Sequence, residues 1–407
     1  MVVKKLERDT SIENDNRLTM THKFKVQVYN KISSKGLSLF DENKYDVSTE
    51  HKEPDAILLR SYKLQEGDLP QSVKVIARAG AGVNNVPQPY SSEKGIVVFN
   101  TPGANANAVK ELVLCAMFMC SRDILGAANH VLNLEEVISK DIEKVKSQFK
   151  GSEIFGKNVL IVGLGAIGIS VANALNALGM HVYGYDPFIS VKSAWGLSRE
   201  VKLIDSLSSV LSQVEYVSVH MPLTDKTKGF INSNLLKTLS KSVSILNFSR
   251  SEIVDHNDIL NALKSNSIHK YVTDFPHIDF QKLSNVISLP HLGASTVEAE
   301  DNCAVMAVEQ LINYLEEGRI KNSVNFPNLQ SRLQAKYRVE IKHKNIPSMV
   351  QKISSHFGNA GINILEMMNK SRDELAVTLI DVDTDPKKLL EKLNDNYILS
   401  VRIIESR

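Results

Sequence analysis

The chain has 407 residues, of which 43% are hydrophobic and 23% charged, and its net charge is +2 at neutral pH. A chain of this length forms roughly two or three domains with sizeable cores. Because positive and negative charges alternate along it, no extended basic surface for nucleic acid is expected. The cysteines Cys115, Cys120 and Cys303 lie in apolar segments without metal-ligand spacing, which predicts reduced core thiols, a cytoplasmic location and no metal site.

The N-terminal third predicts a charged tail followed by a small sheet. Residues 1–22 lack an apolar stretch, so they are expected to be a solvated tail and not a signal peptide. No uncharged apolar run reaches the ~18 residues of a membrane span, and no membrane partner is expected. Short apolar runs separated by turns predict parallel strands. These runs are residues 24–29, 56–59, 75–79 and 96–100.

Residues 104–131 are apolar on most faces, which predicts one buried helix that crosses into a second domain. Apolar runs in that domain supply six strand candidates, the number of a doubly wound sheet. They are residues 158–162, 181–185, 216–219, 244–246, 271–273 and 286–289. A helix over about residues 297–317 is expected to return the chain to the first domain, and the cleft between the domains is the expected active site.

The segment NVLIVGLGAIG, residues 158–168, carries a glycine fingerprint directly after an apolar strand. Gly163 lets the chain turn out of the strand, Gly165 allows a pyrophosphate to approach the backbone, and Gly168 allows close packing of the next helix. That helix begins at Ala166 and Ile167, where unpaired N–H groups favour an anion. The fingerprint therefore predicts a dinucleotide site.

The second strand of this unit ends at Asp186, 18 positions after Gly168. A carboxylate at this position accepts a hydrogen bond from the ribose hydroxyl and repels a 2′-phosphate. The expected cofactor is therefore NAD and not NADP.

Polar side chains follow the predicted strands, where ligands of open α/β sheets bind. They are Arg60, Arg78, Asp186, His220, Arg250, Asp274 and His291. Hydride transfer from a carbinol needs a base for the hydroxyl proton, which suits His291. It also needs a guanidinium for the carboxylate or carbonyl, which suits Arg250. A carboxylate behind the histidine would stabilise the imidazolium, and Asp279 is the candidate.

The motifs VGLGAIG, YDP, HMPLT, NFSR and PHLGAST occur in this order, and residues 25–327 resemble the D-isomer-specific 2-hydroxyacid dehydrogenases. RAGAGVNNVP and NTPGANANAVKEL resemble the phosphoglycerate dehydrogenase branch of that family. The resemblance implies NAD-dependent oxidation of D-3-phosphoglycerate to 3-phosphohydroxypyruvate, the first step of L-serine biosynthesis.

The resemblance also implies a catalytic set of Arg250, an acid and His291. The family has a Glu 29 positions after the arginine, where this chain has the shorter Asp279, with Asp274 and His277 nearby. The implied cofactor contacts beyond the glycine loop are Asp186, His220, Pro222, Thr224, Ser249 and Asp274. The implied substrate contacts are Arg60, Ser61, Gly80, Ala81, Gly82 and Val83.

Residues 328–336 are the expected linker, and residues 337–407 show the strand and helix order βαββαβ of a ferredoxin-like unit. The segments HKNIP and GINI resemble an ACT domain, a regulatory module of amino-acid biosynthetic enzymes. That resemblance implies L-serine contacts at His343, Asn345 and Asn363. Ser348 replaces the usual glycine and either crowds a ligand or caps the helix. A purely structural dimerisation role for this unit is the alternative.

The expected fold is therefore α/β. A Rossmann-like NAD-binding domain (107–301) is inserted in a flavodoxin-like substrate domain (23–106 and 302–327), and a ferredoxin-like ACT domain (337–407) follows. A homo-oligomer, dimer or tetramer, is expected, and Trp195 is expected in the core. Two other functions stay open: a 2-hydroxyacid reductase for hydroxypyruvate, glyoxylate or pyruvate, and a non-catalytic NAD-sensing protein resembling the corepressors of this fold.

Overall fold

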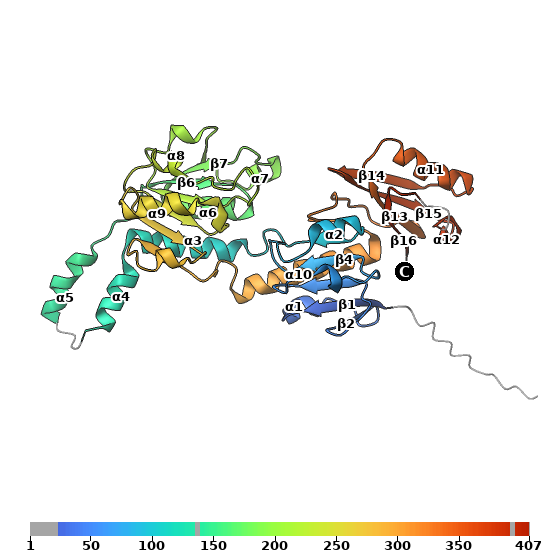
Figure 1. Cartoon of the computed structure of the whole chain (residues 1–407), viewed down its shortest axis with the longest axis horizontal. Helices are drawn as coiled ribbons and strands as arrows, with labels where there is room; N and C mark the ends of the chain where they lie inside the picture. The colour runs from blue at the N-terminus through green and yellow to red at the C-terminus, as the bar shows by residue number, and fades with distance from the viewer. Residues whose placement is uncertain (1–22, 135–138, 391–394, 407) are drawn as a thin grey trace, which may run out of the picture.

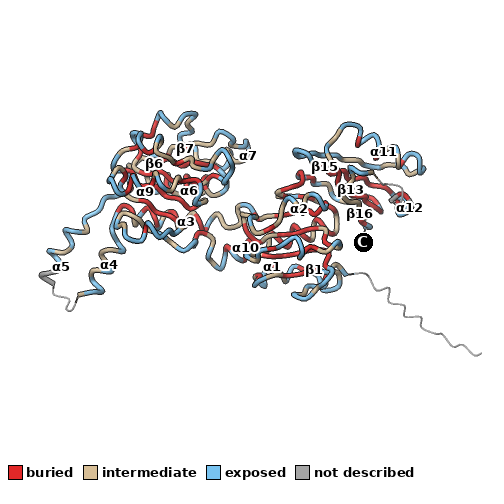
Figure 2. The backbone as a smooth tube through the Cα atoms, in the orientation of Figure 1, coloured by how far each residue is buried: buried red, intermediate tan, exposed pale blue. Residues whose placement is uncertain are grey.

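The computed structural model describes residues 23–134, 139–390 and 395–406, which form three sheets in chain order (Figure 1). The expected tail, residues 1–22, lies outside the described residues. Figure 2 shows that the buried backbone concentrates in the strands of all three sheets. No helix of the described part is long and apolar enough to cross a membrane.

The first domain contains a five-stranded parallel sheet in the flavodoxin-like order β2-β1-β3-β4-β5. Its strands are β1 (Phe24–Tyr29), β2 (Tyr45–Ser48), β3 (Ala56–Leu59), β4 (Val75–Arg78) and β5 (Val97–Phe99). Its helices are α1 (Ser34–Leu37), α2 (Gln88–Glu93) and α10 (Val297–Glu317). Strand β3 is apolar at every position because helix α10 covers one face of the sheet and the α2 side covers the other.

The second domain contains a seven-stranded parallel sheet in the order β12-β11-β10-β9-β6-β7-β8. The order reverses between β6 and β9, which creates the crevice where dinucleotides bind in doubly wound folds. The strands are β6 (Asn158–Val162), β7 (His181–Tyr185), β8 (Lys202–Leu203), β9 (Tyr216–Val219), β10 (Ser244–Asn247), β11 (Lys270–Thr273) and β12 (Val286–Ser288). The six predicted strands are present, and the sequence analysis missed β8 because its two residues are exposed.

The helices of this domain are α3 (Ala106–Ser121), α4 (Ile124–Leu132), α5 (Ser139–Val145), α6 (Ala166–Ala177), α7 (Val191–Trp195), α8 (Ser233–Leu236) and α9 (His256–Lys264). The prediction of one buried helix over 104–131 was wrong. Arg122 has an extended backbone, and the Asp123 carboxylate accepts a hydrogen bond from the Gly126 N–H and starts a new helix. As a result α3 is buried against α6, whereas α4 and α5 form an arm that projects from the domain (Figures 1 and 2).

The C-terminal domain contains a four-stranded antiparallel sheet in the order β14-β15-β13-β16, covered by helices α11 and α12. Its elements are β13 (Tyr337–Lys344), α11 (Met349–Asn359), β14 (Glu366–Arg372), β15 (Leu375–Val382), α12 (Lys387–Leu390) and β16 (Ile398–Glu405). Met349, Ile353 and Phe357 of α11 pack on the odd-numbered residues of β13. This is the ferredoxin-like arrangement.

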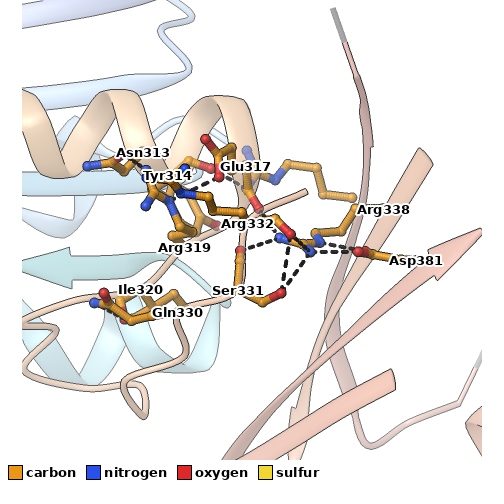
Figure 3. Close-up of polar contacts among 11 residues, drawn as sticks. Asn313, Tyr314, Glu317, Arg319, Ile320, Gln330, Ser331, Arg332, Arg338 and Asp381 are labelled. Atoms are coloured by element: carbon orange, nitrogen blue, oxygen red, sulfur yellow. Dashed lines mark hydrogen bonds and ion pairs between the residues drawn. The ribbon is translucent and has the colours of Figure 1, made fainter. Parts of the chain in front are cut away.

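The other face of this sheet is fixed to helix α10 and the linker by buried charges. The Arg338 guanidinium donates to both carboxylate oxygens of Asp381, at 2.6 and 2.7 Å. It also donates to the main-chain oxygens of Glu317, Ser331 and Arg332 (Figure 3). One side chain therefore joins the sheet to the end of α10 and to the expected linker.

A second buried group lies next to this one. The Glu340 carboxylate accepts hydrogen bonds from the Tyr314 hydroxyl of α10 at 3.0 Å and from Arg402 Nε at 2.9 Å. Lys342 Nζ lies 3.4 Å from the same carboxylate. Polar groups buried in this way hold the C-terminal domain in one defined position on the first domain.

Two single-residue expectations were wrong, and one of two alternatives for a third residue is not supported. Trp195 is 86% exposed instead of core, and Cys115 is exposed whereas Cys120 and Cys303 are buried. Ser348 precedes α11 with φ +69° and makes no side-chain capping bond. This left-handed backbone explains why a glycine suits the position, and it excludes the capping role for Ser348.

Candidate active site

The glycine loop between β6 and α6 has three different steric requirements. A Cβ at Gly163, where φ is +93°, would lie 2.7 Å from the His220 backbone. A Cβ at Gly168 would overlap the carbonyl oxygen of Gly163. At Gly165 a Cβ would meet no described atom within 4 Å, so the open space lies in front of the loop.

This open space faces the N-terminus of the 12-residue helix α6, whose cap residue Gly165 has no side chain to satisfy the first N–H groups. The N–H groups that open the helix, Ala166 and Ile167 among them, are therefore suited to a pyrophosphate. Asp186 lies beside the loop. Its carboxylate accepts hydrogen bonds from the Leu164 N–H and the Phe188 N–H, each at 2.9 Å. These bonds fix the acid at the end of β7, where a ribose hydroxyl is recognised.

The other expected cofactor contacts surround the same crevice at the ends of β9 and β10. The His220 ring accepts or donates a 2.9 Å hydrogen bond with Ser218 Oγ. Burial lowers the pKa of His220 to about 4, so the ring is neutral at physiological pH. Ser249 Oγ donates to the Met221 carbonyl, which ties the two strand ends together.

The segment with Pro222 and Thr224 forms an exposed turn closed by Thr227, whose hydroxyl lies 2.8 Å from the Thr224 N–H. The open space at Gly165, the free helix N-terminus and the fixed Asp186 together fit a bound NAD.

Three arginines from both domains converge next to this crevice. Arg78 Nε donates to the Arg60 carbonyl at 3.1 Å, and a Cβ on Gly82 would lie 2.7 Å from Arg250 Nη2. Burial lowers the pKa of Arg78, and the like charges of Arg250 and Arg60 lower it further. Arg60 is paired with Glu300 of α10 at 2.7 Å, whereas Arg78 has no ion pair within the described residues. Such a cluster is suited to an anionic substrate.

The remaining expected substrate residues lie on the two loops that carry these arginines. Ser61 is exposed directly after Arg60. The carbonyl of Gly80 accepts from the Thr101 N–H at 3.0 Å, and that of Ala81 accepts from Asn100 Nδ2 at 2.6 Å. Val83 is half-buried and packs against the core below the loop. These bonds hold the loop at the point where the chain leaves the first domain.

His291 follows β12 on a loop that Asp274 holds. The buried Asp274 carboxylate accepts hydrogen bonds from the N–H groups of Leu292 and Gly293, each at 2.7 Å, and its carbonyl accepts from the His291 N–H at 3.1 Å. His291 has φ +57°, a strained backbone for a residue with a side chain. Asp274 was expected to contact the cofactor, but both of its carboxylate oxygens bind the loop that presents His291.

The expected support of His291 by Asp279 is absent from the structure. Asp279 pairs with His256 Nε2 at 2.9 Å and His277 Nδ1 at 3.3 Å, and within the described residues it forms no hydrogen bond or ion pair with His291. The reason is local: Asp279 lies in the short 3-10 turn Ile278–Phe280, whose N-cap is His277, and the turn directs its carboxylate toward the start of α9. The His291 ring packs against Phe275 instead, with ring centroids 5.2 Å apart.

A pocket of about 510 Å³ lies in front of the His291 ring. His256 and His277 line it together with His291 and Ser251, the residue after Arg250. The sequence analysis did not identify His256, because it lies 21 positions before His277 in a different element and belongs to no motif.

The three residues expected to bind L-serine differ in their burial and hydrogen-bond partners. His343 is buried, with one ring nitrogen 2.8 Å from the Lys344 carbonyl and the other 2.9 Å from Thr378 Oγ1. Asn345 Nδ2 donates to the Asp373 carbonyl at 3.0 Å, and Asn363 is exposed. A ligand that contacts His343 therefore has to displace one of its hydrogen bonds.

Comparison with known proteins matches residues 114–293 to the family described as D-isomer specific 2-hydroxyacid dehydrogenase, NAD binding domain. A D-3-phosphoglycerate dehydrogenase of Methanocaldococcus jannaschii is 32% identical over 287 residues, which are 68% of this chain and 53% of that protein. One of Bacillus subtilis is 30% identical over 322 residues, 75% of this chain and 59% of that protein. The chain spans about half the length of the curated relatives that it matches.

Among solved structures, the NAD+-bound 3-phosphoglycerate dehydrogenase of Entamoeba histolytica matches with a TM-score of 0.61 and 25% identity, over 76% of this chain and 100% of that one. Residues 114–293 therefore form an NAD-binding domain of the D-isomer-specific 2-hydroxyacid dehydrogenase family, and the inserted two-domain fold is similar to that of the solved 3-phosphoglycerate dehydrogenase.

Proposed function

We propose that the protein catalyses the NAD-dependent oxidation of D-3-phosphoglycerate to 3-phosphohydroxypyruvate, the first step of L-serine biosynthesis. The observation that carries the proposal is the convergence of Arg60, Arg78 and Arg250 beside the NAD crevice. A substrate with both a carboxylate and a phosphate supplies the negative charge that three neighbouring guanidinium groups favour. The names of the relatives above support the same reaction.

In the proposed reaction the chain's own residues bind the substrate and move one proton. Arg250 holds the carboxylate through Nη2, because its Nη1 already donates to the Ser249 carbonyl at 2.6 Å. Arg78, together with Arg60, faces the phosphate. The His291 imidazole removes the C2 hydroxyl proton while the C2–H hydride leaves and the C2 carbonyl forms. NAD, when bound, accepts that hydride.

The anchored loop suits this role for His291. Asp274 accepts hydrogen bonds from the backbone N–H groups of His291, Leu292 and Gly293. The imidazole is therefore held in one position before the substrate binds, which lowers the entropic cost of the reaction. Ser251, the residue directly after Arg250 in the chain, also lines this pocket.

The proposal is tested by NADH oxidation with 3-phosphohydroxypyruvate, compared with unphosphorylated hydroxypyruvate, pyruvate and glyoxylate at equal concentration. A strong preference for the phosphorylated acid supports the proposal. Activity on the smaller acids alone favours another 2-hydroxyacid reductase, and no oxidation of any of them favours the NAD-sensing protein.

Two variants sharpen the test. His291→Ala is expected to lose turnover while it still binds NADH. Arg78→Gln is expected to raise KM for the phosphorylated acid more than for glyoxylate, whereas Arg199→Gln, a change at an exposed arginine outside the cluster, leaves both unchanged. Equal effects of Arg78→Gln on both acids would remove Arg78 from phosphate recognition.

We also expect a homo-oligomer that uses the projecting arm. Helix α4 has no buried residue, and Ile124, Leu125, Val131 and Leu132 all expose large apolar side chains. A cluster of this kind marks an interaction surface. Light scattering of the wild type and of Leu125→Glu tests this expectation: the variant is expected to have a lower mass, and an unchanged mass would place the contact elsewhere.

Regulation by L-serine stays a prediction. Calorimetric titration of the full chain with L-serine tests it, with Asn363→Ala as the variant expected to weaken binding. Absence of heat with the wild type would favour a structural role for the C-terminal domain.

A further inference from the structure

Two histidines and an aspartate meet at the edge of the pocket that His291 lines. His256 is the first residue of α9, His277 precedes the 3-10 turn Ile278–Phe280, and Asp279 lies in that turn. Asp279 Oδ2 lies 2.9 Å from His256 Nε2 and 3.3 Å from His277 Nδ1. All three potential ligand atoms lie within 4.8 Å of one another.

This donor set has the chemistry of a transition-metal site. Neutral imidazole and carboxylate are ligands of Zn²⁺ and of similar divalent ions, whereas Ca²⁺ and Mg²⁺ prefer oxygen alone. With Zn–N distances of about 2.0–2.1 Å, neighbouring ligand atoms of a tetrahedral site lie roughly 3.3–3.4 Å apart. The Oδ2–Nδ1 distance already has this value, and the Oδ2–Nε2 distance has to lengthen by only a few tenths of an ångström.

The two rings are held in place by the protein around them. Their centroids lie 4.0 Å apart, and the buried Phe280 ring packs against both, at 5.2 Å from His256 and 5.9 Å from His277. The turn also fixes the acid, because the Asp279 N–H donates to His277 Nδ1 at 3.3 Å, a bond that has to break when a metal occupies that nitrogen. The cluster is thus built by two elements that packing brings together.

The ligand side chains are also accessible. Between 37% and 48% of each side chain is exposed, so an ion reaches them from solvent and small rotations suffice to adjust the distances. Three protein ligands leave a fourth tetrahedral position open for water or for an oxygen of a pocket ligand.

We propose that His256, His277 and Asp279 form a binding site for one divalent transition-metal ion, with Zn²⁺ as its probe, at the edge of the pocket that His291 lines. The alternative is that the three residues form only a hydrogen-bonded ion pair network. The two differ in one measurable property, which is saturable binding of one metal ion per chain.

The experiment uses the full chain without an affinity tag, in a Cys115→Ser background, because the exposed Cys115 thiol is itself a zinc ligand. Calorimetry measures Zn²⁺ binding, and the visible absorption of bound Co²⁺ reports its coordination. The variants are His256→Gln and His277→Gln. His181→Gln, a change at an exposed histidine that begins β7, is the matched control.

We expect one Zn²⁺ per chain, a Co²⁺ spectrum of low-coordinate nitrogen and oxygen ligation, and at least a tenfold loss of affinity in each site variant but not in His181→Gln. No saturable Zn²⁺ binding to the background protein, or an affinity in both site variants that equals that of the background protein, would overturn the proposal. Thermal unfolding without metal shows that each variant is folded. The Co²⁺ spectrum of the background protein tests the coordination of the metal without the use of any site variant. Because binding is measured directly, the outcome does not depend on the proposed dehydrogenase activity.

Discussion

Replacing Arg338 by methionine is expected to weaken the attachment of the C-terminal domain more than any exposed charge change. The Arg338 side chain is fully buried and that of Asp381 is 4% exposed. Arg338→Met leaves the Asp381 carboxylate buried without its counter-ion, and it also removes the donors to the carbonyls of Glu317, Ser331 and Arg332. Removing one partner of a buried ion pair costs about 3–5 kcal/mol.

Urea unfolding, followed by limited proteolysis of the linker, measures this loss. The expected result is a reduction of about 3–5 kcal/mol in the unfolding free energy of the C-terminal domain and faster cleavage around residues 328–336. The double variant Arg338→Met with Asp381→Leu removes both charges and is expected to recover part of the loss, because no unpaired charge remains whereas the three carbonyls still lack their donor. A cost below about 1 kcal/mol for the single variant, the size typical of an exposed pair, would refute the reasoning.

Three further predictions concern the NAD-binding domain. Asp274→Asn keeps one acceptor for the His291 loop but removes the charge and one of the two 2.7 Å hydrogen bonds. We expect the unfolding free energy measured in urea to fall by about 2 kcal/mol and turnover to fall roughly tenfold to hundredfold, whereas full turnover would show that the loop keeps its position without Asp274. Gly168→Ala forces a Cβ against the carbonyl oxygen of Gly163, and we expect NADH affinity measured by fluorescence to fall by about 1–3 kcal/mol, an outcome that unchanged affinity would contradict. Burial lowers the pKa of His220 to about 4, so below pH 6.5 the unfolded chain binds a proton that the folded chain does not, and the free energy of unfolding falls with falling pH. Between pH 7 and pH 5 the wild type is expected to lose about 2 kcal/mol more unfolding free energy than His220→Gln, and parallel pH profiles of the two proteins would argue against this.

Local sequence patterns were sufficient to predict the elements that an apolar run or a glycine spacing encodes. Strand β6, the glycine loop and strand β7 are predicted at the bounds that the structure shows, because apolar runs and glycine spacing encode them within about 30 residues. The strand β8 and the break at Arg122 were not predictable in this way. The first is too short and exposed, and the second depends on an aspartate cap inside an apolar run.

The candidate site shows the same division at the level of single residues. Arg250 and His291 were identified from their motifs, since each follows a strand within a recognisable segment. The spacing of Asp279 matched the family position, but the direction of its carboxylate is decided by His256, which joins it only through the fold. Likewise the sequence indicates that Asp274 follows a strand, but only the structure shows that its carboxylate binds the loop that carries His291.

The sequence by itself determined the α/β class, the dinucleotide loop and the order of the three units, because these follow from periodicity and from glycines whose partners lie close by in the chain. Tertiary structure alone decided which polar groups meet. The Arg60, Arg78 and Arg250 cluster, the histidine pair around Asp279 and the Arg338 attachment to Asp381 each join residues from separate elements. The physical reason is that a hydrogen bond or an ion pair depends on distances of a few ångströms, which are set by packing of the whole chain and not by the local sequence.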